Sequence, residues 1–412
     1  MHAVGMFLAV ALAAPGASGG DNWPEFRGPQ GEGHGATAVP VRWGEAENVR
    51  WKTAIHDKGW SSPVVWGEQV WLTTARADGR KRFAVCLDRR TGKIVHDVAV
   101  FDIKKPAFCH PFNSYASPTP AVEAGRVYVH FGSAGTACLD TASGKVLWSR
   151  QDLPCDHYRG PGSSPVLWHD LLFVHFDGVD RQYVAALDKA TGRTVWKKDR
   201  DLDYGTDNGD AKKAYGTPVV ITAGTRAELV SPAAVATLVY DPRTGEELWQ
   251  VRHGGMNVSA RPLVGHGLLF LRSGDFGQGL LAVRPDGRGD VTRNHVAWTY
   301  NKAVTGRSSL LLVGDLLYMV NDGGVATCLE AKTGKAVWQK RLGGQFIASP
   351  VVAGGRLYFA NRQGQTFVLE PGRAPKVLAV NRLDDGCMAS PAVADGALFV
   401  RTMTHLYCIQ ER

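Results

Sequence analysis

The chain has 412 residues, a net charge of +8 and an apolar share of 44%, which is ordinary for a soluble globular protein. Its 48 glycines and the lack of any low-complexity tract exclude a fibrous or disordered chain and indicate a fold with many turns. The basic residues are dispersed along the chain, so the charge predicts a solvated basic face and no nucleic-acid partner.

The first residues have the composition of an export signal. Residues 1–20 contain no Lys, Arg, Asp or Glu, and an apolar run at residues 6–14 precedes small residues suited to signal-peptidase cleavage. The run is too short to span a bilayer, and no later segment is typical of a transmembrane helix. We therefore expect a signal peptide at residues 1–20, an N-terminal extension at residues 21–48, and a mature protein that is periplasmic or secreted.

The rest of the chain repeats one phrase, Leu-Asp-x-x-Thr-Gly-Lys-x-x-Trp, in whole or in part. Copies occur at residues 87–93, 139–148, 187–196, 240–249 and 329–338. A second marker, Ser or Thr followed by Pro before a short apolar run, sets the phase of the repeat, and in one copy Leu replaces the Pro. Its eight positions are Pro63, Pro120, Pro165, Pro218, Pro262, Leu310, Pro350 and Pro391. Spacings of 40 to 57 residues leave room for four short strands per unit, which predicts a β-propeller of eight four-stranded antiparallel blades.

The last unit lacks one strand. It has apolar stretches at residues 390–393, 397–401 and 405–409, whereas other units have four. Residues 49–53 resemble an outer strand but precede the first marker and have no unit of their own. We therefore predict that this N-terminal strand joins the last blade and closes the ring, so that residues 49–412 form one all-β domain without an open sheet edge between the first and last blades.

The recurring residues have structural roles that need no ligand. Thr-Gly suits a tight turn, and the Asp can bond the amides of that turn. A Trp on each outer strand can fill the space between neighbouring blades. These structural tryptophans are Trp51, Trp148, Trp196, Trp249, Trp298 and Trp338.

Two connections between blades are rich in Cys and His. Cys109-His110 and Cys155-Asp156-His157 lie in consecutive connections, which open on the same face of a propeller. An exported protein permits a disulfide between Cys109 and Cys155, and two unpaired thiols are the alternative. A metal site built from these Cys and His residues is less favoured, because their spacing matches no zinc motif. We expect no metal.

The same face is the expected place for a binding site, because polar and aromatic loop residues meet there on a rigid ring. The candidate ligand-binding residues are His110, Asn113, Tyr115, His157, Arg159, Tyr215, Arg261 and Arg307. No catalytic motif accompanies them, and their catalytic role, if any, is unknown.

Residues 186–196 read Ala-Leu-Asp-Lys-Ala-Thr-Gly-Arg-Thr-Val-Trp, which resembles the repeat of the PQQ-like, quinoprotein-type β-propeller family. The likeness covers residues 49–412, and residues 23–29 and 113–120 resemble exported PQQ-like proteins of planctomycete-type bacteria. In that family, alcohol dehydrogenases bind pyrroloquinoline quinone (PQQ) and calcium beside a disulfide of adjacent Cys residues, a pair that this chain lacks. The BamB propellers instead hold partner proteins, although this chain lacks their lipidation Cys.

We therefore expect a non-catalytic, BamB-like exported propeller that binds a protein or glycan of the cell envelope through its loop face, as a monomer or within a complex. No cofactor is expected. The alternative is a PQQ- or metal-dependent oxidoreductase, with calcium beside the quinone at the mouth of the channel.

Overall fold

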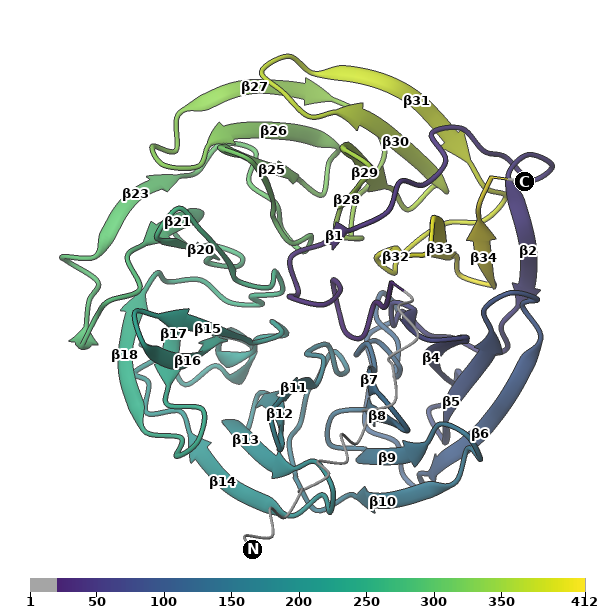
Figure 1. The fold of residues 1–412 in the computed structure, drawn as a ribbon. Coiled ribbons are helices and arrows are strands. Elements are labelled where there is room, and N and C mark those ends of the chain that lie inside the picture. The colour runs from purple at the N-terminus through teal and green to yellow at the C-terminus, as the bar shows by residue number, and fades with distance from the viewer. Residues whose placement is uncertain (1–20, 412) are drawn as a thin grey trace, which may run out of the picture.

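The structure, a computed structural model that describes residues 21–411, confirms the all-β, eight-bladed propeller. Figure 1 shows the eight sheets arranged around a central axis, with their first strands innermost. The expected signal peptide, residues 1–20, lies outside the described residues. Within residues 21–411 no helix is long and apolar enough to cross a membrane, and the helix that is described there, η1 (Gly209–Lys212), is a single turn.

The first four blades follow one another along the chain from the inner to the outer strand. Blade 1 contains β3 (Val64–Trp66), β4 (Gln69–Ala75), β5 (Lys81–Asp88) and β6 (Ile94–Asp102). Blade 2 contains β7 (Ala121–Glu123), β8 (Arg126–His130), β9 (Thr136–Asp140) and β10 (Val146–Arg150). Blade 3 contains β11 (Val166–Trp168), β12 (Leu171–Asp177), β13 (Gln182–Asp188) and β14 (Thr194–Asp199). Blade 4 contains β15 (Val219–Ala223), β16 (Arg226–Pro232), β17 (Ala236–Tyr240) and β18 (Glu247–Arg252).

The last four blades include the exceptions to the simple repeat. Blade 5 contains β19 (Leu263–Gly265), β20 (Leu268–Arg272), β21 (Leu280–Val283) and β23 (Val296–Tyr300), while β22 (Gly289–Asp290) pairs with the edge of blade 4. Blade 6 contains β24 (Leu311–Val313), β25 (Leu316–Val320), β26 (Val325–Glu330) and β27 (Ala336–Arg341). Blade 7 contains β28 (Val351–Ala353), β29 (Arg356–Ala360), β30 (Gln365–Glu370) and β31 (Lys376–Arg382). Blade 8 contains β32 (Ala392–Ala394), β33 (Ala397–Arg401), β34 (His405–Ile409) and β2 (Val49–Ala54).

The ring closes as predicted. The N-terminal strand β2 pairs antiparallel with β34, the last strand of the chain, so that Trp51 lies opposite Cys408. Figure 1 shows the two strands side by side, close to the C-terminus. Blade 8 therefore combines both ends of the repeat region, and this pairing removes the open edge between the first and last blades.

In five blades a tryptophan of the outer strand connects the blade to the next one. The Nε1 of Trp148 donates to the carbonyl of Lys189, in the turn of the following blade, at 3.0 Å. Gly192 in that turn has a φ of 73°, and a Cβ on it would lie 2.5 Å from the Trp148 ring. Trp51, Trp196, Trp298 and Trp338 make equivalent bonds to the next blade. Trp249 differs, because its Nε1 donates to Glu228 of its own blade.

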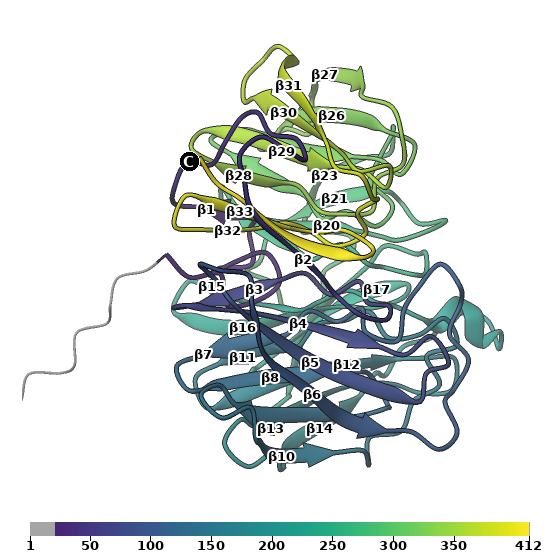
Figure 2. The same ribbon diagram turned by 90° about the vertical axis from the view of Figure 1, so that its right-hand side faces the viewer.

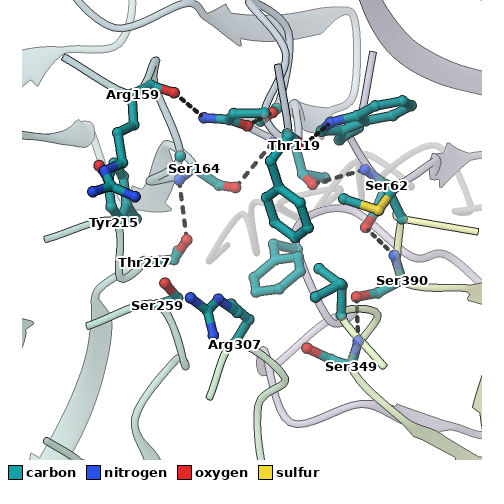
Figure 3. Close-up of a pocket in the computed structure, with 18 of the residues that line it drawn as sticks. Ser62, Thr119, Arg159, Ser164, Tyr215, Thr217, Ser259, Arg307, Ser349 and Ser390 are labelled. Carbon is teal, nitrogen blue, oxygen red and sulfur yellow. Dashed lines mark hydrogen bonds between the residues drawn. The ribbon is translucent and has the colours of Figure 1, made fainter. Parts of the chain in front are cut away.

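A ring of hydroxyl groups joins the blades near the axis. The residue before each Pro marker is Ser or Thr in seven blades, and each N–H in the series 62→119→164→217 donates to the next hydroxyl at 2.9–3.0 Å. The series continues from residue 261 through residues 309, 349 and 390 back to residue 62 at 2.8–3.1 Å. Figure 3 shows part of this ring. The exception is blade 5, where Arg261 stands in place of the hydroxyl residue.

The N-terminal segment, residues 21–48, crosses one end of the channel (Figures 1 and 2). Trp23 pairs through its backbone with Val65, and β1 (His34–Gly35) adds a parallel strand to the inner edge of blade 7. Arg27 is only 2% exposed and donates to the carbonyls of Leu310 and Pro350 at 2.6 and 3.0 Å, as well as to two carbonyls of its own segment. The segment is thus bound to the walls of the channel.

Candidate functional site

A cavity of about 510 Å³ opens on the loop face. We use this name for the face formed by the connections between blades and by the turns between second and third strands. Phe26 of the N-terminal segment lines the cavity, whose other lining residues come from the loops of all the blades. Because the N-terminal segment crosses the opposite end of the channel, the cavity is blind.

One position of the repeat forms much of the cavity wall. The residue two places before the hydroxyl position lines the cavity in each of the eight blades. In ring order these residues are Trp60, Ser117, Gly162, Tyr215, Ser259, Arg307, Ile347 and Met388. They lie just before the inner strand, where the chain turns from the loop face into the channel, so the same place in the repeat faces the cavity in each blade. The type of residue at this position differs widely from blade to blade. Such variation is expected where a surface is shaped to bind a ligand rather than to pack against the protein core.

The wall has an apolar half and a polar half. Trp60, Phe112, Ile347 and Met388 come from connections that flank blades 7, 8 and 1. Arg159, Tyr215, Asn257, Ser259 and Arg307 come from connections between blades 2 and 6. Figure 3 shows Arg159, Tyr215, Thr217, Ser259 and Arg307 together on one side of the cavity. The first group holds the large apolar side chains that the blades contribute, although Gln345 and Arg362 also lie on that side.

Arg159 and Tyr215 retain unused hydrogen-bonding capacity. The Nη2 of Arg159 lies 3.4 Å from an Asp210 oxygen, but its Nε has no partner. The hydroxyl of Tyr215 also has no partner, and burial raises the pKa of Tyr215, an effect that the nearby Arg159 charge opposes. Buried donors without partners cost free energy, so these two side chains are suited to a ligand that accepts hydrogen bonds.

Two further arginines line the cavity. Arg307 pairs through Nη1 with Asp322, and its Nη2 lies 3.7 Å from Asp275. Arg362 donates to Gln345 at 2.7 Å, and its guanidinium lies 5.0 Å from the centre of the Phe112 ring. Among the described residues that line the cavity, Asp322 is the single carboxylate. The lining is therefore positively charged.

The two long connections predicted to form the site are hydrogen-bonded to each other. The amide of Asn113 donates to the carbonyls of Arg159 and Pro161 at 2.9 and 3.0 Å. His110 lines the cavity, and its Nδ1 accepts from the N–H of Phe112. Asn113 thus contributes to the wall and also positions the Arg159 loop. Tyr115 is not among the lining residues, because its hydroxyl donates to Ala107 and its ring packs on Arg82.

His157 lies beneath the loops and is also not among the residues that line the cavity. It is 9% exposed, accepts from the N–H of Ser133 through Nε2, and stacks on Phe176. Burial lowers the pKa of His157 to about 4, so the ring is neutral at pH 7. The expected convergence of His110 and His157 on a single site is therefore not what the structure has.

The structure has Cys109 and Cys155 as free thiols, not as a disulfide. The Cys155 thiol lies beside His157 and the carbonyl of Arg181, whereas the Cys109 thiol faces the carbonyl of Arg159. Within residues 21–411 no group of three or more His, Cys, Asp or Glu side chains is placed to hold a metal ion. The Cys and His residues of the two loops accordingly do not form a metal site there.

Arg261 binds the N-terminal segment and is not among the residues that line the cavity. It is 2% exposed, and its guanidinium donates to Glu25 at 2.8 Å and to the carbonyl of Phe26 at 2.5 Å. Its place in the hydroxyl position of blade 5 was the sequence signal for this role, because a long cation there reaches a partner that Ser or Thr cannot.

Comparison with known proteins places the chain among repeat propellers. The family model described as outer membrane protein assembly factor BamB matches residues 41–180 and 180–412. Tetrathionate hydrolase of Acidithiobacillus ferrooxidans is 24% identical over 257 residues, which are 59% of this chain and 49% of the relative. The match thus spans about half the length of that curated relative.

Two solved structures show the same fold. BamB from Moraxella catarrhalis superposes with a TM-score of 0.61 at 12% identity, over 87% of this chain and 99% of that one. A europium-containing methanol dehydrogenase superposes with a TM-score of 0.69 at 12% identity, over 93% of this chain and 90% of that one. Identities this low show the fold and not the activity.

Proposed function

The chain belongs to the family described as outer membrane protein assembly factor BamB, and on this basis we propose that it is a non-catalytic, exported scaffold that holds a partner protein of the cell envelope through its loop face. It acts in the periplasm or outside the cell, as a monomer or as one subunit of a complex. A glycan is the second class of partner to be tested.

The observation that supports a protein partner is a set of exposed aromatic rings around the cavity. Phe108 is 57% exposed, Tyr158 44% and Phe276 91%, and the Phe108 and Tyr158 rings lie 5.8 Å apart. Phe112, which lines the cavity itself, is 39% exposed. Exposed aromatic side chains beside a concave surface are typical of the residues that supply most of the binding energy in protein interfaces.

Site-specific photo-crosslinking in cells that export the chain tests this proposal. A crosslinking amino acid at Phe108 or Phe276 should give one discrete adduct with an envelope protein. The same amino acid at Val195 serves as the control, because Val195 is also exposed, at 51%, but lies on the outer strand β14. Equal crosslinking from all three positions, or none from Phe108 and Phe276, would overturn the loop-face proposal, and enrichment on glycan beads alone would favour a glycan.

The donor set of the cavity does not favour the oxidoreductase alternative. Calcium beside PQQ requires several oxygen ligands, and carboxylates are the usual ones. Among the described residues that line the cavity, the single carboxylate is Asp322, which is already paired with Arg307. These residues do not fit a quinone with calcium, and we propose no cofactor. Native mass spectrometry of the mature protein with PQQ and calcium should show no added mass, whereas a bound quinone and dye reduction by alcohols would support the alternative.

A further inference from the structure

The shape of the cavity restricts what can enter it. An open channel would admit the middle of a partner chain, but here the N-terminal segment crosses one end of the channel (Figure 1), and Phe26 of that segment lines the cavity. Arg27 and the ion pair between Glu25 and Arg261 hold this segment in place, with each Arg 2% exposed. A blind cavity of about 510 Å³ suits a ligand of small-molecule size or the end of a chain.

The polar half of the wall selects for charge. Arg159 and Arg307 lie in this half, whereas the third arginine of the lining, Arg362, lies beside Phe112 in the other half. Arg159 and Arg307 are 41% and 40% exposed as side chains, so both guanidiniums are accessible. Their acidic neighbours occupy only part of the five donors that each guanidinium carries, and Arg159 Nε and the Tyr215 hydroxyl have no partner. Such donors bind a carboxylate with charge-assisted hydrogen bonds.

The apolar half of the wall favours a ligand that carries an apolar side chain. Phe112, Ile347 and Met388 belong to this half, and the Arg362 guanidinium lies over the Phe112 ring. A free carboxyl group next to an apolar side chain occurs at the carboxyl terminus of a polypeptide. A carboxyl-terminal residue with an apolar side chain would therefore complement both halves of the wall, its carboxylate the polar half and its side chain the apolar half.

We propose that the cavity binds the carboxyl-terminal end of a partner chain, with the terminal carboxylate at Arg159 and Arg307 and an apolar last side chain against Phe112 and Ile347. The proposal rests on the proposed function, since it names the part of the partner protein that the loop face receives. The exposed aromatic rings at Phe108, Tyr158 and Phe276 then contact the residues that precede this end.

A matched pair of peptides tests the charge requirement. The probe is an N-acetylated pentapeptide of glycine and serine that ends in phenylalanine, prepared as the free acid and as the carboxyl-terminal amide, and titrated by calorimetry into the mature chain. The acid should bind at least tenfold more tightly than the amide. In Arg159→Gln and Arg307→Gln this preference should fall to less than threefold. Arg181→Gln should keep it, because Arg181 is exposed on the same face but is not among the lining residues.

Three outcomes would overturn the proposal: equal affinity for acid and amide, no binding of either peptide, or a preference that Arg181→Gln removes as completely as Arg159→Gln. Phenylpropionate bound as tightly as the pentapeptide acid would show a small-molecule site and overturn the chain-end proposal. Crosslinking from Phe108 and Phe276 separates this proposal from the proposed function. If the peptides fail to bind but the crosslinked adduct still forms, the partner docks on the loop face without inserting its carboxyl terminus.

Discussion

Gly192 lies directly against the ring of Trp148 from the preceding blade, in a backbone conformation with a φ of 73°. The glycine therefore has two functions: it adopts the left-handed turn, and it leaves space for the tryptophan. Gly92 and Gly334 face Trp51 and Trp298 in the same way. The Thr-Gly motif and the Trp motif are thus two halves of one contact between blades.

Replacing Gly192 with Ala should separate these two functions when compared with Gly267→Ala. Gly267 has a φ of 72° but no atom within 4 Å of a built Cβ. The left-handed conformation alone should reduce the free energy of unfolding of Gly267→Ala by about 1 kcal/mol. Gly192→Ala should lose about 3 kcal/mol, because the contact with Trp148 adds an overpacking cost. Urea unfolding measures both, and equal losses would show that the contact with Trp148 adds nothing.

His96 shows how a residue can fill a motif position without matching it. It occupies the Trp position of blade 1, where its Nε2 lies 3.2 Å from the Thr141 carbonyl of the next blade. Gly144 of that blade faces the His96 ring, as Gly192 faces Trp148. A search for Trp alone misses this contact, since the feature that recurs is a ring with an N–H beside a glycine.

At the scale of elements, the N-terminal segment determines whether the propeller has a channel or a cavity. The segment contains none of the repeat motifs, so repeat analysis predicts only an extension there. Its position depends on single long-range contacts, such as the hydrogen bonds from Arg27 to Leu310 and Pro350. Burial lowers the pKa of Arg27 to about 9, which is consistent with a guanidinium surrounded by carbonyls instead of by carboxylates.

Replacing Arg27 with Leu should therefore release this segment. The carbonyls that Arg27 bonds would lose their donor in a buried place, and we expect the free energy of unfolding to fall by about 3 kcal/mol. Hydrogen exchange should increase across residues 21–35 and stay unchanged in β2. Arg50→Leu is the control, because Arg50 is exposed and bonds the side chain of Gln410. A loss of stability without faster exchange in residues 21–35 would contradict this role of Arg27.

At the scale of the whole molecule, the predictable features are those that the repeat imposes on every blade. Eight markers and an incomplete last unit were sufficient to predict the ring and its closure by β2 and β34. The cavity wall was only partly predicted. It is lined by five of the predicted residues, namely His110, Asn113, Arg159, Tyr215 and Arg307, while Ile347 and Met388 were missed because polarity was used as the criterion. Their position two residues before the hydroxyl would have identified them. Arg261 was placed at the mouth, although its contact with Glu25 depends on a segment outside the repeat.

Four buried histidines make the stability of the whole ring depend on pH. Burial lowers the pKa of His130 to about 3 and those of His157 and His253 to about 4, and it also lowers the pKa of His175 well below its usual value. The folded chain therefore keeps these rings neutral, while the unfolded chain protonates them below about pH 6.5. Because the unfolded state binds more protons, the free energy of unfolding must fall as the pH decreases through this range.

Between pH 7 and pH 5.5 the four groups together should lower the free energy of unfolding by about 5 kcal/mol. Hydrogen bonds of His56 to Asp57 and Asp97 overcome the effect of burial and raise the pKa of His56, so this ring contributes in the opposite direction. Denaturant unfolding at several pH values measures the slope. His253→Gln should make the slope shallower by about a quarter, since it removes one of four nearly equal contributions. His169→Gln should leave it unchanged, because the side chain of His169 is exposed. A flat profile in the unsubstituted protein, or an equal effect of both substitutions, would show that the buried histidines do not control the acid sensitivity of the ring.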